Sequence, residues 1–170
     1  MSARIRIAVS SCLLGSAVRY DGGHKYSAHI VATLGKQFDF VPICPEVAIG
    51  LGVPRAPLRL VQGLHGARAR GIADPALDVT DRLAAYAKTV AAELYDVSGY
   101  IFKARSPSCG TERVPVHDAN GTPVAAGAGI YAAALRALLP GLPIEDEERL
   151  TDPVIRDNFI ERVLVYHRSR

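Results

Sequence analysis

Tryptophan is absent from this 170-residue chain, methionine occurs once, and cysteine occurs only three times. A small and odd number of cysteines does not fit the disulfide framework of a secreted domain. No stretch reaches the roughly 18 consecutive apolar residues that a membrane-spanning helix needs. The apolar stretch that follows Arg6 is also too short for a secretion signal. We therefore expect a cytoplasmic protein with reduced thiols and no membrane partner.

The chain also lacks a large excess of charge of either sign. Its 20 basic and 17 acidic residues leave a net charge of +3, which does not by itself indicate a nucleic-acid partner. The distribution is less even, because four arginines and no acid lie between residues 53 and 70, whereas residues 145–148 are all acidic. The arginine-rich stretch is either a solvated surface or a phosphate-contacting patch, so nucleic acid is kept as a less favoured partner.

Strand and helix signals alternate along a chain of globular composition, with 49% hydrophobic and 22% charged residues. Apolar and β-branched runs predict strands at 4–10, 38–43, 99–103 and 142–144. Helical spacing and capping residues predict helices at 28–34, 80–94, 129–139 and 153–168, and the stretch 47–76, rich in glycine and proline, is expected to form a long irregular loop. This order predicts an α/β fold: a single domain with a mostly parallel, Rossmann-like sheet and helices on both faces.

All three cysteines follow the carboxyl ends of predicted strands. Because parallel strands end at one edge of a sheet, and ligands bind beyond that edge, Cys12, Cys44 and Cys109 are expected to meet there. They are 32 and 65 positions apart in the sequence. Three unrelated buried thiols are the alternative interpretation.

Four chemistries compete for such a cysteine site. A structural zinc site usually needs four ligands and local C-x-x-C pairs, and a catalytic deaminase-type zinc site needs a spacing that the sequence lacks. A nucleophilic Cys109 needs a base, with Lys103 and Arg105 nearby to lower the pKa of its thiol, but this leaves two cysteines unexplained. An iron-sulfur cubane on three thiolates uses all three and leaves one iron open as a Lewis acid.

Four sequence blocks resemble the thiouracil desulfidase family, long called domain of unknown function 523. The blocks are VSSCLLG with VRYDGG from Val9, VPICPEV from Val41, GVPR from Gly52, and RSPSCG from Arg105. They lie within roughly residues 5–139, in the order and with the spacing of the family. The resemblance implies a 4Fe-4S cluster at the strand carboxyl ends, held by Cys12, Cys44 and Cys109. It also implies that sulfur is removed from thiolated uracil as hydrogen sulfide without net redox change.

The same resemblance implies two catalytic residues beside the cysteines. Glu46 would be the acid/base, and Ser106 would supply a catalytic or orienting hydroxyl, with Ser108 of the same block as the alternative. Judged from the residues alone, Glu46 also suits the first turn of a helix with an N-terminal proline. Both serines equally suit an ordinary turn around the proline between them.

A thiocarbonyl sulfur is a soft donor for the open iron, and its binding would make the ring carbon more electrophilic toward water.

Five side chains are expected to contact substrate or support the loops around it. Arg19 and Asp21 would pair to hold their loop or hydrogen-bond the uracil edge. Lys103 and Arg105 would balance the charge of the cluster or hold a ligand, and Ser108 is placed with them.

The last twenty residues are expected to differ in role from the rest of the chain. Residues 1–150 are predicted to form the desulfidase-like α/β domain, and residues 151–170 a C-terminal helix. This helix resembles the junction to a second, helical domain in longer relatives that act on thiolated transfer RNA, a domain that this sequence does not contain. Its Ile160, Leu164 and Val165 widen the apolar face, which would suit a homodimer.

The leading hypothesis is a 4Fe-4S-dependent enzyme that desulfurates a small thiobase of the 2-thiouracil or 4-thiouracil type. One alternative is a desulfidase of 4-thiouridine in transfer RNA. A second is a non-catalytic module that binds thiobases or sulfide through the same cluster, for which neither Glu46 nor Ser106 would be needed. A third is a cysteine hydrolase without a cluster, which would use Cys109.

Overall fold

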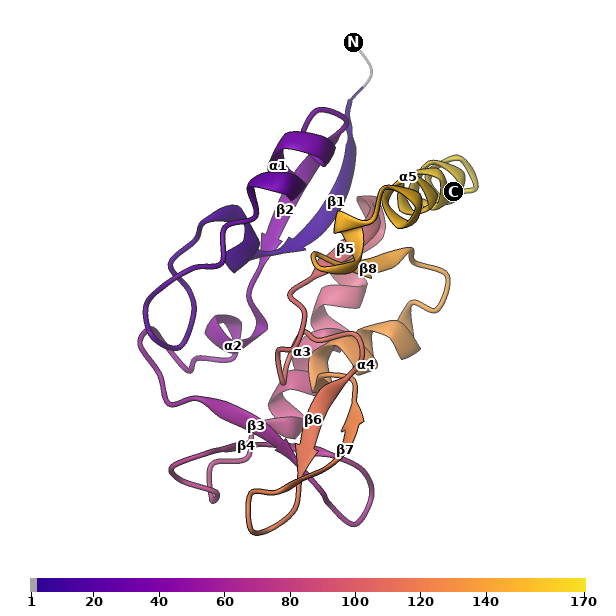
Figure 1. Ribbon diagram of the computed structural model, residues 1–170. Helices are drawn as coiled ribbons and strands as arrows, with labels where there is room; N and C mark the ends of the chain where they lie inside the picture. The colour runs from indigo at the N-terminus through magenta and orange to yellow at the C-terminus, as the bar shows by residue number, and fades with distance from the viewer. Residues whose placement is uncertain (1–2) are drawn as a thin grey trace.

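The computed structural model describes residues 3–170 and contains two four-stranded sheets with helices around them (Figure 1). Sheet A has the strand order β2-β1-β5-β8, and its neighbouring strands all pair in parallel. The strands of sheet A are β1 (Ile5–Ser10), β2 (Phe38–Ile43), β5 (Val97–Phe102) and β8 (Ile144–Asp146). The predicted single α/β domain with a mostly parallel sheet is therefore confirmed.

The last strand of sheet A begins later than the expected strand at 142–144. Pro143 explains the difference, because proline has no N–H group to give to a ladder. Its carbonyl accepts a hydrogen bond from the Tyr100 N–H at 2.9 Å, and Leu142 N–H turns back to the Leu139 carbonyl at 3.1 Å. Regular pairing with β5 starts only at Ile144.

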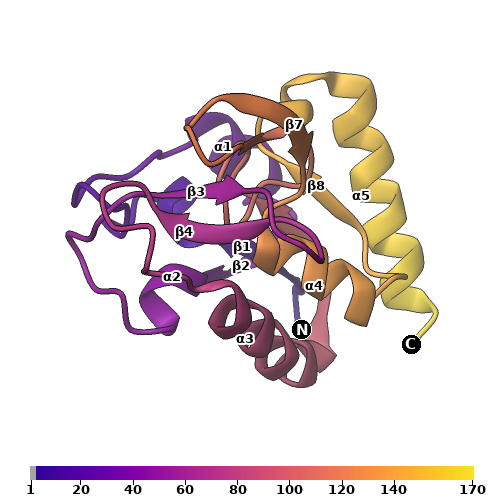
Figure 2. The ribbon, with the colours of Figure 1, turned by 90° about the horizontal axis from the view of Figure 1, so that it is seen from below.

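Helices cover both faces of sheet A, as predicted. On one face lie α1 (Ala28–Leu34) and α5 (Pro153–Arg168), and on the other α3 (Thr80–Glu93) and α4 (Ile130–Leu138). Figure 2 shows β1 and β2 between α1 and α3. Alternation along β1 separates the two cores, because Ile7 and Val9 pack with α1 and α5 whereas Ala8 packs with α3 and α4.

The prediction of a long irregular loop at 47–76 is only partly correct. This stretch contains the short helix α2 (Pro45–Ala48, which begins just before it) and an antiparallel pair of strands, β3 (Leu58–Val61) and β4 (Arg68–Gly71). Leu58 and Leu60 are buried, whereas the residues that alternate with them are only partly covered. Gly63 and Gly66 therefore belong to the connection of a hairpin, whereas Gly50 and Gly52 lie in the irregular segment before β3.

A second pair of strands, which the sequence did not predict, completes sheet B. β6 (Val114–His117) pairs in parallel with β3, and β7 (Pro123–Gly127) pairs antiparallel with β6, giving the order β4-β3-β6-β7. Val114 and Val116 bury their side chains in the larger core. Sheet B extends the fold beyond the predicted Rossmann-like sheet.

The C-terminal helix α5 packs directly on sheet A. Its Phe159 and Val163 are fully buried. Glu145 of β8 binds Arg162 of the helix with 3.1 Å between Oε1 and Nη2. Val165 remains 51% exposed on the outer side, so the homodimer stays a prediction. Among residues 3–170, no helix combines the length and hydrophobicity needed to cross a membrane.

Gly99 of β5 makes the close approach of α5 possible. A Cβ atom at this position would lie 2.8 Å from Val163 Cγ2 and 3.3 Å from Phe159 Cζ, closer than packed carbon atoms allow. We expect Gly99→Ala to lower the free energy of unfolding by about 1–3 kcal/mol, the usual cost of overpacking a core. Urea unfolding measures this change. Gly127→Ala is the matched control, since its Cβ would meet Val116 Cγ2 at 4.0 Å. Equal midpoints for Gly99→Ala and the parent protein would contradict the packing argument.

Candidate active site

The carboxyl ends of three adjacent strands carry the three cysteines. Cys12 lies in the 3₁₀ turn that follows β1, Cys44 lies between β2 and α2, and Cys109 lies in the turns after β5. Because the strand order is β2-β1-β5, these segments lie side by side at one edge of sheet A. All three cysteines line one cavity of about 680 Å³. The sequence-based expectation that they meet at this edge agrees with their placement.

The three thiols are buried to different degrees, and a charge on one of them would change the pKa of the others. Burial raises the pKa of Cys12 and of Cys44, and the positive charges of Lys103 and Arg19 offset part of the rise at Cys12. Burial raises the pKa of Cys109 most, and a negative charge on Glu46, Cys44 or Cys12 would raise it further. Without a bound cation, these environments favour neutral thiols.

The proposed lowering of the Cys109 pKa by Lys103 and Arg105 is therefore wrong. The Arg105 side chain is 75% exposed and pairs with Glu148, with 3.2 Å between Nε and Oε1. The positive charge of Lys103 instead lowers the pKa of Cys12 and so offsets part of the rise that burial causes. A buried thiol with a raised pKa is a weak nucleophile, which counts against the cluster-free cysteine hydrolase.

Three cysteines that line one cavity are a donor set that an iron-sulfur cubane can use, because a cubane binds its thiolates through different iron atoms. Within residues 3–170, no group of three His, Cys, Asp or Glu side chains that could hold a metal ion is found. Metal binding also supplies the positive charge that three buried thiolates require. The residues therefore fit a three-cysteine iron-sulfur cluster.

The Ser106–Gly110 turn distinguishes its two serines. Ser106 Oγ accepts hydrogen bonds from the N–H groups of Ser108 at 3.2 Å and Cys109 at 3.0 Å, and Ser106 lines the cavity. Ser108 is fully buried, is not among the residues that line the cavity, and its Oγ has no hydrogen-bond partner within residues 3–170. Of the two hydroxyls, that of Ser106 is the better placed to reach a ligand.

Glu46 lies in the first turn of α2 and lines the cavity. Its Oε1 accepts a hydrogen bond from Arg55 Nε at 3.1 Å, and the two side chains are 15% and 6% exposed, respectively. Arg55 also lines the cavity. The sequence did not identify Arg55 as a site residue, because it was grouped with the other arginines of its stretch.

Lys103 and Glu147 form a second, partly buried ion pair at the cavity, with 2.5 Å between Nζ and Oε1. Glu147 Oε2 accepts a hydrogen bond from the Ala104 N–H at 2.7 Å, so this side chain joins the end of β5 to the segment after β8. Glu147 was also missed, because residues 145–148 read as an ordinary acidic surface run. The ion pair with Glu147 holds the Lys103 ammonium group, whose charge lowers the pKa of Cys12.

The loop between the first 3₁₀ turn and α1 forms one rim of the cavity. Arg19 lines the cavity, and its guanidinium carbon lies 5.6 Å from the centre of the Tyr20 ring. Asp21 is exposed and lies outside the lining, where its Oδ1 accepts the Gly23 N–H at 2.9 Å, a hydrogen bond that lowers the pKa of Asp21. This placement favours the loop-holding role for Asp21. Tyr20 and Tyr26 add aromatic rings to the rim.

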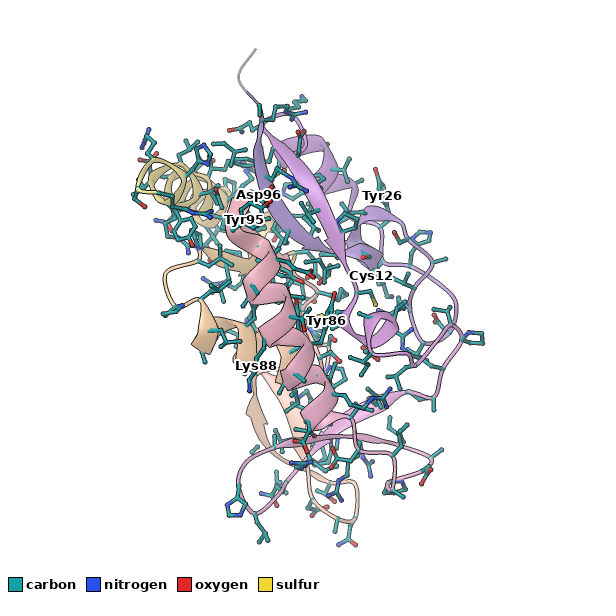
Figure 3. All side chains as sticks on the ribbon, turned by 180° about the vertical axis from the view of Figure 1, so that it is seen from behind. Cys12, Tyr26, Tyr86, Lys88, Tyr95 and Asp96 are labelled. Atoms are coloured by element: carbon teal, nitrogen blue, oxygen red, sulfur yellow. The ribbon has the colours of Figure 1, made fainter. Side chains whose placement is uncertain are left out.

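Aromatic side chains pack beside Cys109, the most deeply buried of the three cysteines. Tyr100 and Phe102 of β5 stack with 3.9 Å between ring centres, and the Tyr100 and Tyr131 hydroxyls lie 3.0 Å apart. Figure 3 shows Tyr86 on α3, Cys12 just beyond β1, and Tyr26 on the segment that leads into α1. Cys109 belongs to the same buried cluster as Tyr100 and Tyr131. These buried rings separate the Cys109 side of the site from water.

The arginine-rich stretch is largely neutralised within the fold. Arg68 and Arg70 both bind Asp78 Oδ2, at 2.9 and 3.1 Å, and Arg55 binds Glu46. Only Arg59 of the four has no ion pair among residues 3–170, and its buried Nε has no hydrogen-bond partner there. Three of the four charges are thus already engaged by carboxylates.

Comparisons with known proteins agree with this geometry. A model of the 2-thiouracil desulfurase family matches residues 7–147, a range that includes all three cysteines and Glu46. The uncharacterized protein YbbK of Bacillus subtilis (strain 168) is 33% identical over 153 residues, which cover 86% of this chain and 98% of YbbK. A solved structure of the [4Fe-4S]-dependent thiouracil desulfidase TudS is similar with a TM-score of 0.67 at 31% identity, covering 87% of this chain and 94% of that chain.

Proposed function

Because the chain belongs to the 2-thiouracil desulfurase family, we propose that it hydrolyses the carbon-sulfur bond of a thiolated uracil to give uracil and hydrogen sulfide. One observation carries this proposal: three cysteines and a carboxylate from the ends of β1, β2 and β5 line a single cavity. The reaction replaces sulfur by oxygen without change of oxidation state, since water supplies the oxygen atom and both protons of hydrogen sulfide.

Cys12, Cys44 and Cys109 would hold a 4Fe-4S cluster, in keeping with the description of TudS. When bound, the cluster supplies a Lewis-acidic iron that is suited to a soft thiocarbonyl sulfur. The buried rings of Tyr100 and Tyr131 would keep bulk water away from Cys109. The half-exposed rim leaves an entrance for a small planar ring.

Glu46 would move the proton. Its Oε1 is occupied by Arg55, whereas Oε2 has no hydrogen-bond partner within residues 3–170. In this proposal Oε2 accepts a proton from the attacking water and returns it to the departing sulfur.

Ser106 would orient the reacting ring. Its Oγ already accepts two backbone N–H groups, so its own O–H proton is left to donate into the cavity. Arg19, Lys103 and Arg105 line the cavity and would complete the binding surface, with Lys103 balancing negative charge near Cys12. Ser108 stays the alternative hydroxyl, although its burial favours Ser106.

We predict that free thiobases are better substrates than thiolated transfer RNA. An enzyme that grips a folded RNA needs many phosphate contacts, and three of the four arginines in the basic stretch already pair with carboxylates. A cavity of about 680 Å³ is sufficient for a single ring. The kcat/KM values for 2-thiouracil, 4-thiouracil, 4-thiouridine and bulk thiolated transfer RNA, measured from sulfide release under anaerobic conditions at two salt concentrations, check this prediction.

A preference for the RNA that weakens steeply at higher salt would contradict this prediction and favour the transfer RNA alternative. Binding of all four compounds without any sulfide release would instead support the non-catalytic module. Release of one sulfide per thiobase consumed supports the proposed hydrolysis.

A further inference from the structure

Arg55 is a nearly buried cation at a position that the proposed chemistry does not yet use. Its side chain is only 6% exposed, although it lines the cavity. A buried guanidinium is stable only where hydrogen bonds and opposite charges replace its hydration. The partners of Arg55 therefore indicate what this buried charge holds in place.

Two backbone contacts fix Arg55 at both ends. Its N–H donates to the Tyr20 carbonyl at 2.8 Å, which ties it to the loop at the cavity rim. Its Nη1 donates to the Gly52 carbonyl at 3.0 Å. With the backbone and the tip of the side chain both held, the guanidinium has little freedom to turn away from the cavity.

The third contact reaches Glu46. Arg55 Nε donates to Glu46 Oε1 at 3.1 Å, and only this oxygen of the carboxylate has a hydrogen-bond partner within residues 3–170. A carboxylate that is held through one oxygen keeps a defined orientation, whereas a free glutamate side chain samples many rotamers. The contact also leaves Oε2 available to a water molecule.

We propose that Arg55 is a positioning residue, which holds Glu46 Oε1 so that Oε2 is available for proton transfer during desulfuration. This inference rests on the proposed function, because it assigns Arg55 a task in that reaction. Arg55 acts through Glu46 and not on the substrate, and this distinguishes it from a ligand-binding arginine.

A double-mutant cycle on the cluster-loaded enzyme tests the proposal. Arg55→Gln is expected to lower kcat by about 10- to 100-fold, the scale of a misplaced catalytic group. The iron and sulfide content and the dissociation constant for uracil, measured by calorimetry, are expected to stay within about 2-fold of the parent values. In the Glu46→Gln background, the same Arg55→Gln change is expected to lower kcat by less than about 2-fold, because Glu46, the group that Arg55 positions, can no longer transfer a proton.

Arg55→Lys and Arg70→Gln complete the experiment. Arg55→Lys keeps the charge but not the fixed fork, so it should restore only part of kcat, and it replaces Arg55→Gln in the cycle if the latter does not fold. Arg70→Gln also removes an arginine from an ion pair, but its partner Asp78 keeps Arg68, and kcat should not change.

The outcomes separate this inference from the proposed function. Full additivity of the two substitutions, or a uracil affinity that falls as much as kcat, would overturn the positioning role and make Arg55 structural or ligand-binding. An inactive Glu46→Gln enzyme alongside a fully active Arg55→Gln enzyme would overturn this inference alone. A parent enzyme that carries its cluster yet releases no sulfide from any thiobase would overturn both.

Discussion

Alanine at any one of Cys12, Cys44 or Cys109 is expected to abolish cluster binding. The parent protein, reconstituted without oxygen, should be brown and contain about four iron and four sulfide per chain. Each thiol comes from a different strand end, and the chain contains no fourth cysteine that could replace a missing ligand. Iron and sulfide analysis together with the visible absorption spectrum measure the loss.

Glu46→Gln is the matched control for these cysteine variants, because it changes a cavity side chain without removing a thiol. It should keep the iron content of the parent. If the protein with all three cysteines replaced by alanine binds as much iron as the parent, the ligand assignment is wrong.

The second large effect is a loss of turnover on replacement of Glu46. Glu46→Gln should lower kcat by about 100-fold or more while 2-thiouracil still binds, because the amide keeps the size of the side chain but cannot accept the proton. The amide can also keep a hydrogen bond from Arg55 Nε, so the local fold should be preserved. Sulfide release per cluster, measured anaerobically, gives the turnover number.

Glu161→Gln provides the comparison for a glutamate far from the chemistry. Glu161 lies on α5, and its side chain is 67% exposed beside Arg168. Its replacement should leave kcat unchanged. Unchanged sulfide release from Glu46→Gln would remove Glu46 from the mechanism and transfer the role of base to another cavity group.

The strands of sheet A could be predicted because their local signals agree with their tertiary environment. β1 and β5 are rich in β-branched or aromatic residues, and both are covered on two faces. Sheet B could not be predicted in the same way. β6 and β7 are only four and five residues long and contain Pro115 and Pro123, and a proline weakens a strand prediction even beside valines such as Val114 and Val116.

In the candidate site as well, some residues could be predicted from the sequence and others could not. The cysteines were predicted to meet because the parallel topology alone brings strand ends together. Arg55 and Glu147 could not be singled out, since one looked like a member of an arginine-rich stretch and the other like part of an acidic run. What distinguishes them is burial beside the cavity, and that depends on where α2 and β8 lie in the folded chain.

The strand order of sheet A also dictates when the cofactor can be acquired. Neighbours β2, β1 and β5 are joined by long crossovers, so Cys12, Cys44 and Cys109 are 32 and 65 positions apart and no single strand-helix unit contains all three. A nascent chain that has not yet delivered Cys109 to the sheet edge cannot hold a three-cysteine cluster, and contacts this distant in sequence form late in folding. If Cys12, Cys44 and Cys109 hold the cluster as proposed, the cluster donor would meet a chain in which sheet A has already formed. Loss of the cluster would then free the three loops at one edge of the sheet, while the buried side chains of β1 and β5 keep their contacts with the helices on both faces, and the chain could be reloaded without refolding.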